Sequence, residues 1–192
     1  MIKIGILGDI GSGKSFVAKQ FGYPVFNADK EVSKLYSKNK DCFHKLKKKL
    51  PEFVTSFPIK KKQLKDAILE NKENIKKIEK IVHPKVQENL KKFINKNKGK
   101  KMLVLDIPLL IENNIKKKNY TLVFVDAKKK DIIKNLKKRK NYNKKIFNSL
   151  KKLQLSLEVK KKKSHYIIKN DFKRSNIKKH VKLLVNKILK NK

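Results

Sequence analysis

The sequence predicts an α/β fold in three layers, in which helices cover both faces of a five-stranded parallel sheet. Three observations predict it: five short apolar runs, the helical patterns that separate them, and a glycine-rich loop directly after the first run. Short apolar runs are typical of buried strands. Strands that alternate with helices favour a parallel sheet. The predicted strands are Ile2–Leu7, Tyr23–Asn27, Met102–Asp106, Thr121–Val125 and Tyr166–Asn170.

The glycine-rich loop predicts a phosphate site. Its sequence GDIGSGKS fits the pattern G-x-x-x-x-G-K-[ST], whose fixed positions are Gly8, Gly13, Lys14 and Ser15. A helical pattern follows, so strand, glycine loop and helix come in the order that a phosphate-binding loop requires. In such a loop the backbone N–H groups point inward, Lys14 supplies positive charge, and the Ser15 hydroxyl is a magnesium ligand. The alternative is a glycine-rich turn that binds nothing, and the agreement of motif and context disfavours it.

Three aspartates end the second, third and fourth predicted strands or closely follow them: Asp29, Asp106 and Asp126. In open α/β sheets, ligands bind outside the carboxyl ends of the strands, where the phosphate loop also lies. A single aspartate at such a place is more often a helix cap or a turn residue. Its place at a strand end makes Asp106 a candidate for holding Mg²⁺ through water, and the alternative is a structural turn before Pro108.

About seventy residues separate the second and third predicted strands, far more than a simple crossover needs. Helical patterns at 30–50 and 60–97 flank an irregular stretch at 51–59, so we expect an inserted helical subdomain at about 30–99. A second helical segment at 128–163 predicts a hairpin about Asn141–Asn143, the place of a lid in nucleotide kinases. The core of this single domain, 1–192, then comprises about 1–29, 100–127 and 164–192.

The net charge of +38 raises the question of a nucleic-acid partner. Arg139 and Arg174 are the only arginines, and the lysines are spread along the chain together with many asparagines. Lysine and asparagine have A-rich codons, so an AT-biased genome gives this balance without any selected function. Arginine is the commonest reader of bases, and its scarcity disfavours base recognition. We expect no specific nucleic-acid partner.

The sequence also excludes several other classes. No apolar run approaches the roughly 18 residues of a membrane span, and the chain begins inside a predicted strand, so we expect a cytoplasmic protein with no membrane partner. Cys42 is the single cysteine, which excludes an internal disulfide and a cysteine zinc cluster. His44, His165 and His180 have no ligand-like spacing, so they predict no metal site. The oligomeric state stays open.

Several segments, in order and spacing, together resemble the dephospho-coenzyme A kinase family over nearly the whole chain. The segment LGDIGSGKS is similar to the phosphate loop of that family, and VFNAD to its second-strand motif. VHPKV resembles its His-Pro helix, DIPLLIE its third-strand signature, and QLSLEVKKKKSHYIIKN the segment that enters its last strand. The resemblance implies a P-loop NTPase-type fold: a kinase core with a CoA-binding helical subdomain and a lid.

The implied reaction is phosphoryl transfer from MgATP to the ribose 3′-hydroxyl of dephospho-CoA, which gives ADP and CoA. Asp29 ends the segment VFNAD and matches the second aspartate of the Asp-Ala-Asp motif of the family, where the resemblance implies a general base. Arg139 is the one arginine of the predicted lid and is expected to contact the transferring phosphate. His83 and Glu112 are expected on the acceptor side. The residues expected to bind ATP are Gly8, Gly11, Ser12, Gly13, Lys14, Ser15, Phe16 and Asn170.

The chain departs from the usual family pattern at several positions. Asp9 stands where glycine is common, Asn27 where the first aspartate of Asp-Ala-Asp is common, Phe16 where threonine is common and His165 where aspartate is common. In the lid, Asn135 and Leu150 stand where arginine is frequent, and Lys140 where aspartate is frequent. Two other functions share the phosphate loop: a nucleoside or nucleotide kinase, and a P-loop ATPase that binds nucleic acid. The combined His-Pro and PLLIE segments favour the dephospho-CoA kinase over the first of these.

Overall fold

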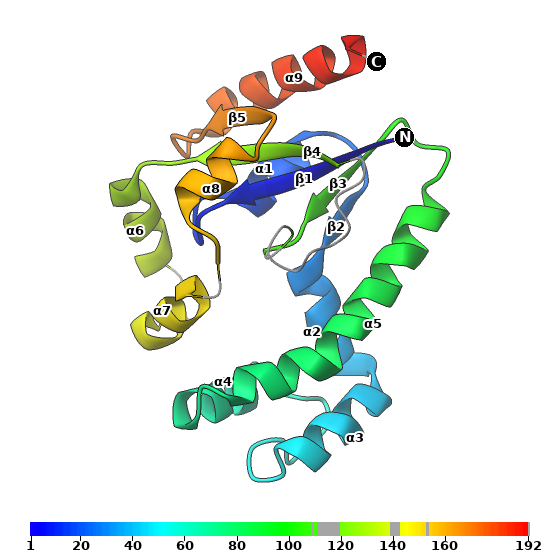
Figure 1. Cartoon of the computed structure of the whole chain (residues 1–192), viewed down its shortest axis with the longest axis vertical. Coiled ribbons are helices and arrows are strands. Elements are labelled where there is room, and N and C mark those ends of the chain that lie inside the picture. The colour runs from blue at the N-terminus through cyan, green and yellow to red at the C-terminus, as the bar shows by residue number, and fades with distance from the viewer. Residues whose placement is uncertain (109, 111–119, 139–142, 153, 192) are drawn as a thin grey trace. The chain divides into compact units, whose positions relative to one another are not determined.

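The computed structural model describes residues 1–108, 110, 120–138, 143–152 and 154–191. They form two compact units. The first comprises 1–27, 97–142 and 151–192, and the second comprises 28–96 and 143–150. Figure 1 labels the helices and strands of both.

The first unit is built on a five-stranded, all-parallel sheet, as the sequence predicts. The strand order is β2-β3-β1-β4-β5, so the strand that leads into the glycine loop lies in the centre. All five carboxyl ends meet at one edge because every pairing is parallel. The strands are β1 Ile2–Gly8, β2 Val25–Asn27, β3 Met102–Asp106, β4 Tyr120–Asp126 and β5 Tyr166–Lys169.

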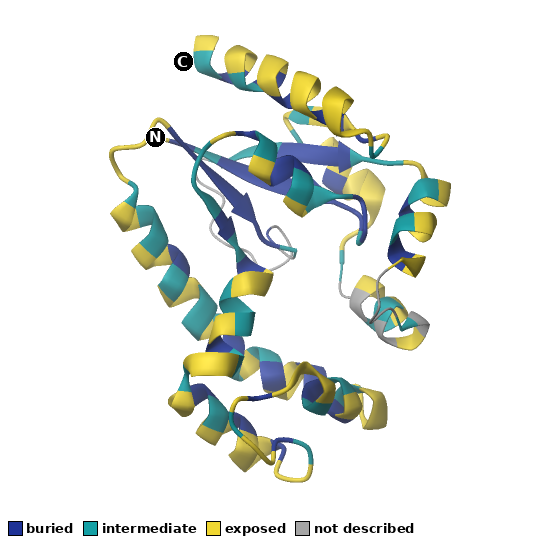
Figure 2. Cartoon of the chain, turned by 180° about the vertical axis from the view of Figure 1, so that it is seen from behind, coloured by how far each residue is buried: buried dark blue, intermediate teal, exposed yellow. Residues whose placement is uncertain are grey.

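Helices lie on both faces of this sheet. Helices α1 (Lys14–Gln20) and α9 (Arg174–Lys190) pack together on one face, and α8 (Leu157–Lys162) packs on β1 from the other (Figure 1). The central strands β1 and β3 are almost wholly buried (Figure 2), which explains their continuous apolar runs, whereas the edge strand β5 is partly exposed. The three-layer prediction is therefore confirmed.

The second unit is helical. It contains α2 (Ala28–Lys38), α3 (Lys40–Lys49), α4 (Lys61–Glu70) and α5 (Asn74–Lys96). These helices share an apolar core of their own that includes Cys42 and Leu46, both fully buried. They occupy the stretch in which the sequence predicts a helical insertion. The role of that stretch in binding substrate stays a prediction.

Asparagines divide the predicted helical stretches into shorter helices. Asn39 ends the first helix and begins the next, since its side-chain oxygen accepts a hydrogen bond from the Cys42 N–H (2.7 Å). Asn71 accepts in the same way from the Glu73 N–H (2.9 Å), between α4 and α5. The Asn74 amide donates to the Ala67 carbonyl near the end of α4 (2.8 Å). Asparagine side chains compete with helical backbone hydrogen bonds, so each of these positions favours a break.

The predicted lid segment also differs from a simple hairpin. It contains α6 (Lys129–Lys137), α7 (Lys144–Lys152) and α8, and residues 139–142 of the predicted turn lie outside the described residues. The additional helix α8 begins at Ser156, whose hydroxyl accepts from the Val159 N–H (3.2 Å). Nowhere in the described part of the chain is a helix both long enough and apolar enough to cross a membrane.

Replacing Asn39 with Ala should lower the free energy of unfolding by about 1 kcal/mol, because the first turn of α3 loses its cap. Asn39→Asp keeps the acceptor oxygen, so its free energy of unfolding should stay close to that of the unchanged protein. Urea unfolding followed by circular dichroism measures both. Equal losses in the two variants would show that the cap contributes nothing.

Candidate active site

The glycine loop joins β1 to α1 at the carboxyl edge of the sheet. Gly11 and Gly13 have φ angles of 86° and 88°, a left-handed backbone that favours glycine. A Cβ on Gly13 would collide with the Asn170 amide, and one on Gly11 would lie 2.8 Å from the Leu136 Cγ. Both glycines are therefore required by conformation and by the close approach of neighbouring elements.

Asn170 links the end of β5 to this loop. Its side-chain Nδ2 donates to the Ser12 carbonyl (2.7 Å), and its Oδ1 accepts from the Phe172 N–H (2.8 Å). Its own N–H donates to the Asp126 carbonyl (2.7 Å), at the end of β4. The side chain is buried, so these bonds are protected from water. The sequence predicts that Asn170 binds ATP, and the structure places it in direct contact with the loop backbone.

Asn135 on α6 contacts the loop from a second direction. Its Nδ2 donates to the Gly11 carbonyl (3.2 Å), while Ile132 and Leu136 of the same helix pack beside Gly11. In the sequence, Asn135 stands out only as a residue that replaces a frequent lid arginine. No local pattern marks it as a loop contact, because the bond joins residues 124 positions apart.

The catalytic lysine candidate also binds the loop backbone. The Lys14 ammonium donates to the Asp9 carbonyl (2.7 Å) and to the Gly8 carbonyl (3.2 Å). Ser15 is exposed at the start of α1. Ser12 is fully buried, and its hydroxyl oxygen has no hydrogen-bond partner in the described structure. A buried hydroxyl without a partner is costly, so this loop is suited to receive a polar group.

Asp9 occupies a position at which the family commonly has glycine. Its buried carboxylate accepts from the adjacent Ile10 N–H (2.7 Å). This bond uses one loop N–H and places a negative charge at the loop. The sequence marks the departure, and only the structure shows which group Asp9 contacts.

Asp106 and Asn27 form a pair at the same edge of the sheet. They are register partners on β3 and β2, and the Asn27 Nδ2 donates to the Asp106 Oδ2. Asp106 is buried, with 4% of its surface exposed. Asp126, at the end of β4, instead forms an exposed ion pair with Lys161 (3.3 Å).

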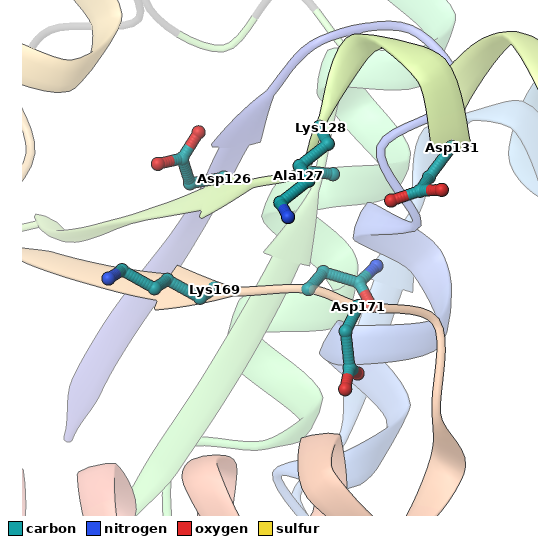
Figure 3. A pocket seen from close by; sticks show the side chains of 7 residues that line it. Asp126, Ala127, Lys128, Asp131, Lys169 and Asp171 are labelled. Atoms are coloured by element: carbon teal, nitrogen blue, oxygen red, sulfur yellow. The ribbon is translucent and has the colours of Figure 1, made fainter.

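A pocket of about 400 Å³ opens beside the loop, at the carboxyl ends of β4 and β5 (Figure 3). Asn170, which donates to the loop backbone, also lines this pocket. Hydrogen bonds from the Lys173 N–H and the Asn176 amide lower the pKa of Asp171, so this carboxylate is ionised at neutral pH. The lining residues are Asp126, Ala127, Lys128, Asp131, Lys169, Asn170 and Asp171.

Phe16 lies against the core of the first unit. Its half-buried ring packs on the apolar cluster beneath α1 and α9, and the Arg174 guanidinium carbon lies 5.9 Å from the ring centroid. The contact of Phe16 with ATP, which the sequence predicts, stays a prediction.

The remaining site candidates lie elsewhere. Asp29 is exposed in the first turn of α2, two residues after β2 ends, and His83 is half-buried in α5. Both belong to the second unit. Glu112 and Arg139 lie outside the described residues. The described residues contain no group of three metal-ligating His, Cys, Asp or Glu side chains.

Comparison with known proteins identifies the family. A sequence model of dephospho-CoA kinases matches residues 2–176. The chain belongs to the dephospho-CoA kinase family. The resemblance found in its motifs is therefore confirmed. Kinases of this family use ATP as the phosphate donor.

Curated relatives agree with this assignment. A dephospho-CoA kinase of Bartonella henselae is 39% identical over 129 residues, which cover 65% of this chain and 66% of the relative. One from Wolbachia sp. subsp. Brugia malayi is 41% identical over 114 residues, which cover 57% of this chain and 58% of that protein. The aligned segments thus span less than two thirds of the length of these relatives.

Solved structures share the fold over almost the full chain. A crystal structure of a Thermus thermophilus protein matches with a TM-score of 0.77 and 26% identity, covering 97% of both chains. The dephospho-CoA kinase from Campylobacter jejuni matches with a TM-score of 0.65 and 22% identity, covering 97% of this chain and 96% of that one. A shikimate kinase from Bacteroides thetaiotaomicron, at a TM-score of 0.51 and 13% identity, shares the fold alone.

Asn170→Ala should weaken ADP binding at least about tenfold, because the Ser12 carbonyl loses its donor and the loop its support. Titration calorimetry with ADP measures the loss. Asn186→Ala, on the exposed face of α9, is the matched control and should bind as the unchanged protein does. Full ADP affinity in a folded Asn170→Ala protein would show that this support is not needed.

Proposed function

We propose that this chain transfers the γ-phosphoryl group of ATP to the ribose 3′-hydroxyl of dephospho-CoA. The observation that carries the proposal is the supported glycine loop, with Lys14 at its end, in a chain of this family. The products are ADP and CoA, and the acceptor is a small molecule. The scattered lysines of the sequence supply no argument for a specific nucleic-acid partner.

The loop backbone supports phosphate binding at Gly8, Gly11, Ser12 and Gly13. The carbonyls of Gly11 and Ser12 accept hydrogen bonds from Asn135 and Asn170, outside the loop. The N–H of a trans peptide points opposite to its carbonyl, so the Ser12 carbonyl held by Asn170 favours a Gly13 N–H that faces inward. The Ser12 N–H itself donates to the Asp9 carbonyl (3.1 Å), which closes the turn of the loop. The Lys14 ammonium is at the same loop and adds the positive charge that β- and γ-phosphates need.

The donor set also fits Mg²⁺. This ion keeps several waters and binds through a few oxygen ligands together with substrate phosphates, so it needs no cluster of protein carboxylates. The Ser15 hydroxyl would bind it directly, and the Asp106 carboxylate through water. When bound, Mg²⁺ neutralises charge on the phosphates. Ser15 and Asp106 would thereby help to hold the nucleotide in one orientation.

The pocket beside Asn170 is the proposed site of the nucleoside part of ATP. Its volume of about 400 Å³ is within the usual range for small-molecule sites. The ionised Asp171 and the neighbouring Asp131 and Asp126 offer acceptors to ribose hydroxyls and to a base amino group. Phe16, at the start of α1, is the further proposed ATP contact.

The acceptor side of the proposal involves four more residues. Asp29 takes the proton of the attacking 3′-hydroxyl, and Arg139 stabilises the charge of the phosphoryl group in transfer. His83 and Glu112 contact the acceptor. The family motifs support these roles, since each residue matches a segment by which the chain resembles dephospho-CoA kinases.

The function is tested by ADP release with a panel of acceptors: dephospho-CoA, nucleosides, nucleoside monophosphates, RNA and DNA. We expect turnover with dephospho-CoA alone, and a product phosphorylated at the 3′-hydroxyl. Lys14→Ala should abolish turnover while the circular dichroism spectrum is retained, because it removes the positive charge beside the phosphates. Lys48→Ala, an exposed lysine of α3, is the matched control. Stimulation by nucleic acid without dephospho-CoA would contradict the proposal.

Asp29→Asn should lower the single-turnover rate by roughly two to four decades, the range of a positioned acid–base group, with ATP affinity little changed. The smaller end is expected because a loose transition state needs little help from a base. Asp66→Asn, at an exposed site on α4, serves as the control. An unchanged chemical step would rule out the base, and a loss of ATP affinity would instead indicate a magnesium ligand.

A further inference from the structure

The pairing of Asn27 with Asp106 has a consequence for how the chain holds a metal-bound nucleotide. The two side chains lie on neighbouring strands at matched register, and the Asn27 amide donates to the Asp106 Oδ2. Among the described residues, this is the one side-chain donor to that carboxylate. Asp106 is almost fully buried, whereas Asn27 is half-buried.

The register of the sheet places this pair next to the glycine loop. Gly5 of β1 is paired with Leu105 of β3, so Asp106 comes beside the next residue of β1, two positions before Gly8 begins the loop. Asp106 and the loop therefore leave the same edge of adjacent strands. A carboxylate here is in place to contact a water of a metal ion bound to phosphates in the loop.

The residue type at position 27 decides how Asp106 is held. The family commonly has aspartate there, and two carboxylates side by side would repel each other. An amide of the same shape donates a hydrogen bond and carries no charge. Asn27 thus occupies Oδ2 and leaves Oδ1 for a ligand, and it restricts the rotation of the carboxylate.

We propose that Asn27 is a positioning residue for nucleotide-bound Mg²⁺, and that it acts through Asp106. The inference rests on the proposed function, since it takes the loop to bind nucleotide phosphates. Asn27 itself touches neither phosphate nor metal in this proposal. A hydrogen bond to a metal-binding carboxylate fixes its orientation, and loss of such a partner commonly weakens metal affinity about 10- to 100-fold.

The test is the affinity for ADP with and without Mg²⁺, measured by titration calorimetry in Mg²⁺ and in EDTA. The dissociation constant in EDTA divided by that in Mg²⁺ reports how much the metal strengthens ADP binding. In Asn27→Ala we expect this ratio to fall about tenfold, while the affinity in EDTA stays unchanged. A general disturbance of the loop would weaken both affinities equally and would overturn the proposal. Asn186→Ala is the matched control.

A double-mutant cycle decides whether the effect passes through Asp106. Asp106→Ala should lower the same ratio at least as much as Asn27→Ala does. The ratio of the double variant should equal that of Asp106→Ala alone. The proposal would be overturned by fully additive losses in the double variant or by a normal ratio in Asn27→Ala. It would also be overturned if the ADP affinity of the wild-type protein did not depend on Mg²⁺. No acceptor is present in these titrations. A failure to phosphorylate dephospho-CoA would therefore overturn the proposed function and leave this result intact.

Discussion

The site depends on one constraint: the glycine loop must keep a fixed backbone shape, so that its remaining N–H groups are available for an anion. The structure meets it with two side-chain donors from outside the loop and with the lysine of the loop itself. Asn170 at the end of β5 holds the Ser12 carbonyl, Asn135 on α6 holds that of Gly11, and Lys14 binds those of Gly8 and Asp9. The loop therefore takes its shape from the whole carboxyl edge of the sheet.

The strand order explains why these donors reach the loop. β1 lies in the centre, with β4 and then β5 on one side and β3 and then β2 on the other. Asn170 and the pocket that it lines come from the β5 side, whereas Asp106 and Asn27 come from the β2 side. The departures from the family pattern also fit this arrangement, since Asn27 and Asp9 each form a hydrogen bond at the edge.

Much of the fold could be predicted because its signals are local. Apolar runs gave the five strands within about two residues, and the spacing of Gly8, Gly13 and Lys14 gave the loop. The breaks at Asn39 and Asn71 were missed, since helical periodicity continues across them and an asparagine is also tolerated inside a helix. The support from Asn135 was missed because it depends on a contact between distant segments.

The central claim is that the loop from Gly8 to Ser15 receives the phosphates of the nucleotide through its backbone. Amide NMR of the ¹⁵N-labelled chain, titrated with ADP and Mg²⁺, tests it most directly. The account predicts that the largest shifts fall on the N–H groups of Gly11, Gly13 and Lys14, with smaller shifts around Asn170. Saturable ADP binding that leaves the loop amides unmoved and shifts other residues would contradict it.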